Sequence, residues 1–321
     1  MVNIKEITVV VSNTFSPSEI NRMQKECPDY VTFYATDENN PDMDLLTQAD
    51  IIIGFFTPEA VSQCPRLQWL QLTVVGFEKY ILPGITPRQA TITNARGAFG
   101  QEVSEHMFAV LLSLLKKLEI YRDNQTKHVW HDEGMVRTLT NATVLIVGAG
   151  SIGTAFAQLC FALGAHCIGF RRHIPDDITP FEKVTTLDHL HEYVGQADVV
   201  ASFLPYSEET TDLFNSDFFT AMKHGSYFLN GGRGNSVVLH DLASALIDHH
   251  LAGAGLDVFV HEPLSADSEL WDVPHLIVTP HIAGNIRGDF HLYEAAEKTT
   301  DLACANLRAW FAHEPLTNLI R

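Results

Sequence analysis

Residues 144–153 read VLIVGAGSIG, a run of four apolar residues that leads into a G-x-G-x-x-G turn. An apolar, helix-like stretch follows at residues 154–163. In a dinucleotide-binding unit with this order of strand, turn and helix, Gly148 permits the tight turn, Gly150 lets a pyrophosphate approach the backbone, and Gly153 allows close packing of helix on strand. We therefore predict a dinucleotide site here, although a plain turn between a strand and a helix would use the same glycines.

The helix predicted over residues 154–163 follows directly on Ser151, Ile152 and Gly153. A helix N-terminus presents N–H groups without intrahelical partners and carries a partial positive charge, and both attract phosphate groups. Ser151, Ile152 and the three glycines therefore form the predicted phosphate-binding loop.

The strand predicted next, residues 167–170, ends in Arg171 and Arg172. An NAD site carries an acidic residue about 20 positions beyond the glycines, where it binds the ribose 2′-hydroxyl, but the first acid in this region is Asp176. Two guanidiniums suit the dianionic 2′-phosphate of NADP(H), and each charge-assisted contact contributes about 1.5–3 kcal/mol. We expect NADP(H) to be preferred. NAD(H) stays the alternative, because the arginines could be solvated surface charges or stack on adenine.

The composition of the chain limits the classes of function. Its 321 residues suggest about two domains, and 46% hydrophobic against 19% charged residues is a globular balance. The formal net charge of −18 disfavours nucleic acid and anionic membranes as partners. Five cysteines without a C-x-x-C pair argue against a disulfide framework and a structural zinc, so we expect no metal site. The longest apolar stretch, residues 108–115, is too short for a membrane span, and we expect a soluble, cytoplasmic protein.

Alternating strand-like and helix-like segments predict an α/β fold with two domains. Short apolar runs typical of buried parallel strands lie at residues 7–11, 51–53, 67–72, 199–203, 227–230, 255–258 and 276–279. Apolar residues recur at steps of three and four from Phe99 to Leu115, which predicts a long helix. A last helix is predicted over residues 289–311, with candidate core positions at Leu292, Ala295, Ala296, Leu302, Leu307 and Trp310.

Three of the later strands are each followed by a segment with one polar residue in a suggestive setting. These are Arg233 in NGGRG, Glu262 in DVFVHEP and His281 in TPHIAG. Ligands of open α/β sheets bind at the carboxyl ends of the strands, so we expect all three side chains on one edge. Each residue alone has a plainer explanation, since the chain has 16 histidines and many surface charges.

These segments resemble the signature motifs of the D-isomer-specific 2-hydroxyacid dehydrogenases. The glycine turn, NARG at residues 94–97, Leu204-Pro205 and LWDVP at residues 270–274 also resemble that family. The motifs occur in the same order over nearly the whole chain, and together they are specific for the family but not for a substrate.

The resemblance implies two doubly wound parallel-sheet domains, with a Rossmann cofactor domain inserted in a flavodoxin-like substrate domain. Residues 1–96 plus 287–321 would form the substrate-binding domain, and residues 97–286 the Rossmann NAD(P)-binding domain. The active site would lie in the cleft between them. The resemblance also implies a homodimer built largely through the cofactor domain, including the helix after Phe99.

For the chemistry, the resemblance implies a catalytic set of Arg233, Glu262 and His281. His281 would donate a proton to the substrate carbonyl oxygen. Glu262, as a buried carboxylate, would hydrogen-bond the far side of the imidazole and favour its protonated form. Arg233 would bind the substrate carboxylate, a bidentate task that suits a guanidinium. The pairing of Glu with His also separates the chain from formate dehydrogenases, which use Gln beside the histidine.

The same resemblance assigns the remaining site residues. Asp257 would orient the nicotinamide carboxamide, and the backbone around Val75 and Gly76 would hold the substrate carboxylate. Further cofactor contacts would come from Leu204, Pro205, Gly232, Arg233, His281 and Gly284. The candidate walls of the substrate pocket are Phe55, Phe56 and Trp271. Aromatic walls suit an apolar 2-oxo acid, although core packing explains both phenylalanines equally well.

Together these features predict an oxidoreductase that reduces 2-oxo acids to D-2-hydroxy acids by hydride transfer from a nicotinamide cofactor, with NADPH preferred. Its partner would be a small-molecule 2-oxo acid or 2-hydroxy acid. Two alternatives stay open. One is a glyoxylate/hydroxypyruvate reductase with a small polar pocket, and the other is a dinucleotide-sensing interaction protein that keeps the same three residues.

Overall fold

The computed structural model describes residues 6–284 and 294–321. Contacts divide the chain into two compact units, one of residues 1–99 and 288–321 and one of residues 100–287. Each unit contains one sheet, and every pair of neighbouring strands named below is parallel. The predicted fold class, α/β with two parallel sheets, is confirmed.

The first unit has a five-stranded sheet in the order β2-β1-β3-β4-β5, which is the flavodoxin-like order of a doubly wound fold. Its strands are β1 (Ile7–Ser12), β2 (Val31–Thr36), β3 (Ile51–Ile53), β4 (Trp69–Gln71) and β5 (Thr91–Thr93). The outer side of β5 is covered by residues 318–321. There Ile92 N–H donates to Arg321 C=O and Ile320 N–H donates to Ile92 C=O, both at 2.8 Å.

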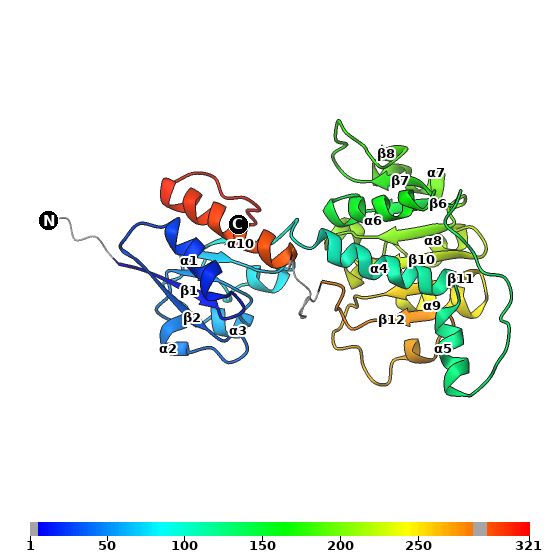
Figure 1. The fold of residues 1–321 in the computed structure, drawn as a ribbon, viewed down its shortest axis with the longest axis horizontal. Coiled ribbons are helices and arrows are strands. Elements are labelled where there is room, and N and C mark those ends of the chain that lie inside the picture. The colour runs from blue at the N-terminus through cyan, green and yellow to red at the C-terminus, as the bar shows by residue number, and fades with distance from the viewer. Residues whose placement is uncertain (1–5, 285–293) are drawn as a thin grey trace. The chain divides into compact units, whose positions relative to one another are not determined.

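Helices cover both faces of this sheet, because successive strand residues point to opposite sides. Val9 packs in one core with Met23 of α1 and Leu307 of α10, whereas Val10 packs in a second core with Leu46 of α2. The helices are α1 (Pro17–Lys25), α2 (Met43–Leu46), α3 (Pro58–Val61), a 3-10 turn (Glu78–Ile81) and α10 (Glu294–Ala312). Helices α1 and α10 lie side by side on one face of the sheet (Figure 1), although they are far apart in the sequence.

The second unit has a seven-stranded sheet in the order β12-β11-β10-β9-β6-β7-β8. Counted within the unit from β8, the order is 3-2-1-4-5-6-7, the Rossmann order with one additional strand. The strands are β6 (Thr143–Val147), β7 (His166–Phe170), β8 (Lys183–Thr185), β9 (Val199–Ser202), β10 (Ser226–Asn230), β11 (Leu251–Leu256) and β12 (Leu276–Val278).

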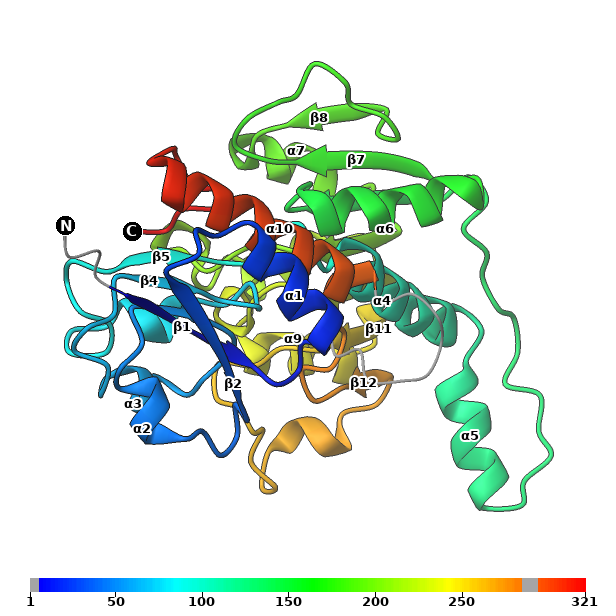
Figure 2. The ribbon, with the colours of Figure 1, turned by 60° about the vertical axis from the view of Figure 1, so that its left-hand side comes forward.

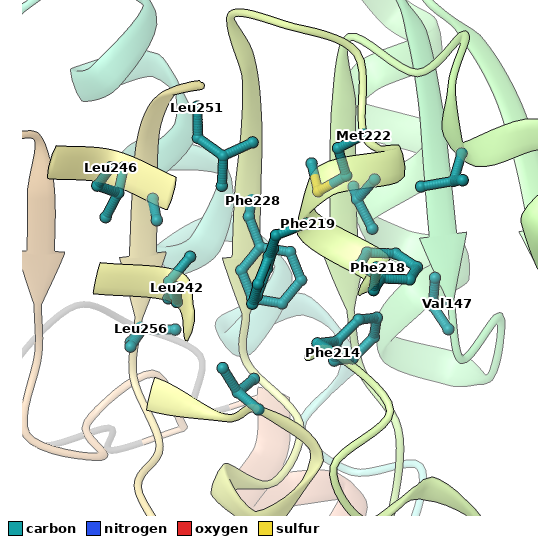
Figure 3. Packing of buried hydrophobic residues seen from close by; sticks show 14 of the residues in the cluster. Val147, Phe214, Phe218, Phe219, Met222, Phe228, Leu242, Leu246, Leu251 and Leu256 are labelled. Atoms are coloured by element: carbon teal, nitrogen blue, oxygen red, sulfur yellow. The ribbon is translucent and has the colours of Figure 1, made fainter. Parts of the chain in front are cut away.

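One face of the second sheet packs on an aromatic cluster (Figure 3). Phe214, Phe218, Phe219 and Phe228 contact one another edge to face, with ring centroids 4.9–6.0 Å apart. This geometry adds a favourable quadrupole interaction to the burial of apolar area. The helices of this unit are α4 (Gly100–Leu115), α5 (Leu118–Thr126), α6 (Ser151–Ala162), α7 (Leu190–Val194), α8 (Ser216–Ala221) and α9 (Leu239–Ile247), with 3-10 turns at Leu187–His189, Glu208–Thr210, Gly234–Ser236 and Glu269–Asp272.

Helix α5 and the chain after it extend away from the sheet of the second unit (Figure 2). Several large apolar side chains of this arm are exposed, and they are Leu118, Val129, Trp130, Met135 and Val136. Among the helices of the described residues, none combines the length and apolar character needed to cross a membrane.

The sequence prediction missed three strands, β2, β5 and β8, and all three are edge strands. Edge strands need no continuous apolar run, and β5 and β8 have only three residues each, so a search for buried apolar runs does not find them. The predicted last helix is observed as α10, which is described from Glu294, so Leu292 lies outside the described residues.

The predicted strand at residues 255–258 was also wrong in its bounds, since β11 spans Leu251–Leu256. Its glycines hide the apolar pattern, yet the packing requires them. A Cβ added at Gly255 would lie 2.3 Å from Val110 Cγ1 of α4. As a result Asp257 is not a strand residue but the first residue after the strand.

Candidate active site

The glycine turn between β6 and α6 is shaped by close backbone contacts. Gly148 has a φ of +100°, which favours glycine, and a Cβ added there would lie 2.7 Å from the backbone carbon of Phe203. A Cβ added at Gly153 would lie 2.4 Å from the carbonyl oxygen of Gly148. At Gly150, by contrast, an added Cβ would meet nothing within 4 Å. The turn needs Gly148 and Gly153 for its own packing, whereas Gly150 borders open space.

Helix α6 begins at this open space. Its N-cap is Gly150, and its first helical hydrogen bond joins Thr154 N–H to Gly150 C=O at 2.8 Å. The N–H groups of Ser151, Ile152 and Gly153 precede that bond and therefore have no acceptor within the helix. Amide donors, the positive end of a helix dipole and open space fit the pyrophosphate of a dinucleotide.

Arg171 and Arg172 follow β7, the strand that pairs with β6. The backbone N–H of Arg171 donates to Thr185 C=O at 2.9 Å, and its side chain is half-buried, with no ion pair inside the described ranges. Arg172 Nη2 lies 2.7 Å from Glu209 Oε2, and both side chains are exposed. An acidic residue therefore already competes for one of the two predicted 2′-phosphate ligands.

The loop that carries Arg233 is held by side-chain hydrogen bonds. Asn230 Oδ1 accepts from Gly232 N–H at 3.1 Å, and Asn230 Nδ2 donates to Arg233 C=O at 3.0 Å. The Ser236 hydroxyl donates to the same carbonyl at 2.8 Å. A Cβ added at Gly232 would lie 2.6 Å from the Leu204 carbonyl oxygen, so the loop packs directly on the segment after β9.

His281 and Glu262 form a hydrogen-bonded pair between the loops after β12 and β11, which are neighbouring strands. His281 Nδ1 lies 2.7 Å from Glu262 Oε2, and Phe259 N–H donates to Glu262 Oε1 at 2.9 Å. The expectation of a buried Glu262 was wrong, since 35% of its side chain is exposed. The reason is that residues 260–263 form an exposed loop rather than part of the core.

Asp257 is the buried carboxylate of this edge, with 2% of the residue exposed. Its Oδ1 accepts from the Thr279 hydroxyl at 2.6 Å and from Ile282 N–H at 3.0 Å, and its Oδ2 accepts from Ala283 N–H at 3.0 Å. These donors lie on both sides of His281, whose φ of +53° is uncommon for a residue other than glycine. Asp257 therefore holds the His281 loop, and its contact with a nicotinamide stays a prediction.

The sequence reasoning did not select two side chains that join this network, Thr279 and His106. His106 Nε2 on α4 lies 3.1 Å from Thr279 Oγ1 and 3.8 Å from Asp257 Oδ1. Thr279 stood in the TPHIAG motif, where a hydroxyl at a strand end was a usable signal. His106 is 173 residues away from Thr279 in the chain, and nothing in the sequence distinguished it from the other histidines.

The remaining predicted substrate residues are divided between the units. In the first unit Phe55 is half-exposed just after β3, but Phe56 is fully buried in the core, so core packing explains Phe56. Val75 C=O accepts from Asn94 Nδ2 at 2.6 Å, which ties the Val75 loop to the chain after β5. In the second unit Trp271 is half-exposed and donates its Nε1 proton to Ser265 C=O at 2.8 Å.

Two further predicted cofactor residues also lie in the loops of the second unit. Pro205 follows Leu204 after β9, and Gly284 is the last residue described before the gap at 285–293.

Comparisons with known proteins bear on the whole chain. The family model described as "D-isomer specific 2-hydroxyacid dehydrogenase, NAD binding domain" matches residues 108–283. The chain belongs to this family. It is similar to a crystal structure of a D-isomer specific 2-hydroxyacid dehydrogenase family protein from Aeromonas salmonicida, with 30% identity, a TM-score of 0.84 and 99% of each chain covered.

Named relatives of this dehydrogenase include two reductases. The glyoxylate reductase of Thermofilum pendens is 28% identical over 89% of this chain and 86% of that protein. The glyoxylate/hydroxypyruvate reductase B of Klebsiella pneumoniae is 31% identical over 69% of this chain and 70% of that protein. The chain is thus an oxidoreductase of the 2-hydroxyacid dehydrogenase family with a nicotinamide-cofactor domain.

The open space at Gly150 makes a specific prediction for cofactor binding. The Gly150→Ala variant should fold normally, because the added methyl group meets no protein atom, but it should bind NADPH and NADH about 10–100-fold more weakly, which corresponds to one or two lost charge-assisted contacts. Thermal melting of the apoprotein and a fluorescence titration measure the two effects. The matched control is Gly153→Ala, which should lower the melting temperature itself. Wild-type affinity in Gly150→Ala would contradict the assignment.

Proposed function

We propose that this protein reduces small 2-oxo acids to D-2-hydroxy acids and prefers NADPH as hydride donor. The observation that carries the proposal is the 2.7 Å hydrogen bond between His281 and Glu262. It forms at the carboxyl ends of β11 and β12, on the sheet edge where the Arg233 loop follows β10. A proton donor and a guanidinium on one edge are the groups that reduction of a 2-oxo acid requires.

In this proposal His281 supplies the proton. A bound nicotinamide dinucleotide supplies the hydride, and the carbonyl oxygen of the substrate gains negative charge that a proton must neutralise. Because Nδ1 of His281 faces Glu262, Nε2 is the ring atom that holds and donates this proton. Glu262 fixes the orientation of the ring and balances the charge of the imidazolium.

Arg233 is proposed to bind the substrate carboxylate, since a planar guanidinium can donate two parallel hydrogen bonds to it. For the other unit, the backbone N–H groups around Val75 and Gly76 are proposed as substrate contacts. We assign cofactor binding, together with the substrate contacts of Arg233 and His281, to the unit of residues 100–287, and the contacts around Val75 to the unit of residues 1–99 and 288–321.

The preference for NADPH rests on the two arginines after β7. Arg171 has no acidic partner among the described residues, so its guanidinium is available to a phosphate, whereas Arg172 would have to leave Glu209. The two arginines should therefore contribute unequally, with Arg171 as the main ligand of the 2′-phosphate.

Two aromatic side chains bear on which 2-oxo acid the protein reduces. The half-exposed Phe55 and Trp271 favour an apolar 2-oxo acid. The names of the Thermofilum and Klebsiella relatives favour a second candidate, a glyoxylate/hydroxypyruvate reductase. Both candidates use the same three catalytic residues and differ only in the substrate that they accept.

Steady-state rates with NADPH and NADH test the cofactor proposal. Replacing Arg171 by Ala should raise KM for NADPH about tenfold or more and leave KM for NADH within about threefold, because only NADPH carries the 2′-phosphate. Arg172→Ala is the matched control and should have a smaller effect. Equal changes for both cofactors would contradict the role of Arg171. A panel of glyoxylate, hydroxypyruvate and branched 2-oxo acids measured alongside separates the two substrate candidates.

Removal of the imidazole tests the mechanism. His281→Ala should lower kcat about 100–10,000-fold, the usual contribution of a general acid, while NADPH still binds. Glu262→Gln keeps the size of the partner and should have a smaller effect. Near-normal turnover of His281→Ala would refute the mechanism. Tight NADPH binding by the wild-type protein without turnover of any acid would instead support the dinucleotide-sensing alternative.

We also propose that the protein is a homodimer, in which the α5 arm packs on a second copy. The support is the fully exposed Trp130 on an arm where Leu118, Val129, Met135 and Val136 are exposed as well. Light scattering should give twice the chain mass of 35.7 kDa, and joint replacement of Trp130 and Met135 by Ser should shift the protein toward the monomer. A wild-type protein that stays monomeric at micromolar concentration would overturn this proposal.

A further inference from the structure

Three side chains from separate elements form one hydrogen-bonded chain beside His281. His106 comes from the first half of α4, Asp257 follows β11, and Thr279 follows β12. The distances along the chain are 3.1 Å from His106 Nε2 to Thr279 Oγ1 and 2.6 Å from Thr279 Oγ1 to Asp257 Oδ1.

The chemistry of the groups gives the direction of each hydrogen bond. The Asp257 carboxylate accepts two backbone N–H groups, from Ile282 and Ala283, as well as the Thr279 hydroxyl. The single hydroxyl proton of Thr279 is used in the short contact with Asp257, so its oxygen can only accept from His106. His106 Nε2 therefore carries a proton. His106 donates to Thr279, and Thr279 donates to Asp257.

The far end of this chain holds the backbone around His281. Thr279 lies two residues before His281, and Ile282 and Ala283 lie one and two residues after it, yet all three donate to the same carboxylate. His281 itself has a φ of +53° and would relax toward more common backbone angles if the loop were released. The position of its ring thus depends on where the Asp257 carboxylate is fixed.

We propose that Thr279 and His106 are positioning residues, which fix Asp257 and through it the catalytic alignment of His281. This inference rests on the proposed function, because it takes His281 as the proton donor. The alternative is that these hydrogen bonds only link α4 to the edge of the sheet and play no part in catalysis. Removing a purely structural link would lower the stability of the protein and leave kcat unchanged. The value of kcat in variants of Thr279 and His106 therefore distinguishes the two hypotheses.

The test uses variants that remove or keep each donor. Thr279→Val keeps the shape and removes the hydroxyl, so kcat should fall about tenfold or more, since small misplacements of a catalytic group are costly. KM for NADPH should change less than about threefold, because the amide donors proposed for the pyrophosphate, at the N-terminus of α6, are not part of this network. Thr279→Ser restores the hydroxyl and should return kcat to within about twofold of wild type.

His106 is tested in the same way. His106→Leu should lower kcat about threefold or more, and His106→Gln, whose amide can donate from a similar position, should restore most of it. If His106 acts only through Thr279, His106→Leu should have no further effect on kcat in a Thr279→Val protein. This double-mutant cycle also covers the case in which one variant folds poorly, because His106→Leu leaves all three donors to Asp257 in place.

The matched control is Thr86→Val in the other unit, which likewise removes a hydrogen-bonded hydroxyl, here a buried one that donates to Tyr80 C=O at 2.8 Å. It should lower the melting temperature without changing kcat. If Thr279→Val and His106→Leu behave like this control, with kcat within twofold of wild type, the positioning role is overturned. If instead His281→Ala keeps its turnover, the proposed function fails first, so the two failures are distinguishable.

Discussion

Direct backbone-to-backbone packing at the carboxyl edge of the second sheet is the constraint on which the site depends. Added Cβ atoms at Gly148, Gly232 and Gly234 would lie only 2.1–2.7 Å from backbone atoms of Phe203, Leu204 and Phe259. Real Cβ atoms do not approach other atoms so closely, so these three positions do not accept a larger residue unless the loop backbones move. The glycines thereby determine how closely the loops after the strands pack on one another. The position of Arg233, which lies between Gly232 and Gly234, depends on this packing.

The two carboxylates of this edge have divided roles because their surroundings differ. Asp257 is buried, and three donors of the His281 loop converge on it, so it serves the geometry of the backbone. Glu262 lies in an exposed loop and contacts the imidazole itself. A buried polar network with all its members satisfied makes the structure around it rigid. The His281 loop is thus held through its backbone by Asp257 and through its imidazole by Glu262.

The glycine turn and the three motifs after later strands could be predicted from the sequence, because each is a short continuous pattern. The apolar strand at residues 144–147 and the glycines after it are contiguous, and the motifs with Arg233, Glu262 and His281 each follow a strand. The signals that failed are those set by tertiary packing. Edge strands such as β2 and β8 lack a full apolar run, and β11 is hidden by glycines that α4 requires. His106 joins the site only through its contact with Thr279, which lies 173 positions away in the sequence, and no local pattern predicts such a contact.

The discontinuity of the first unit has a consequence for how the chain is made. Its sheet is complete once residues 91–93 are synthesised, but Ala303, Cys304 and Leu307 of α10 cover one of its faces. At about 5–20 residues per second, the roughly 200 residues between them keep the ribosome occupied for about 10–40 s. During that interval Val9, Val11 and Trp69 lack part of their cover, while the contiguous second unit is synthesised. One face of the N-terminal sheet is therefore completed only by residues that are made late in synthesis.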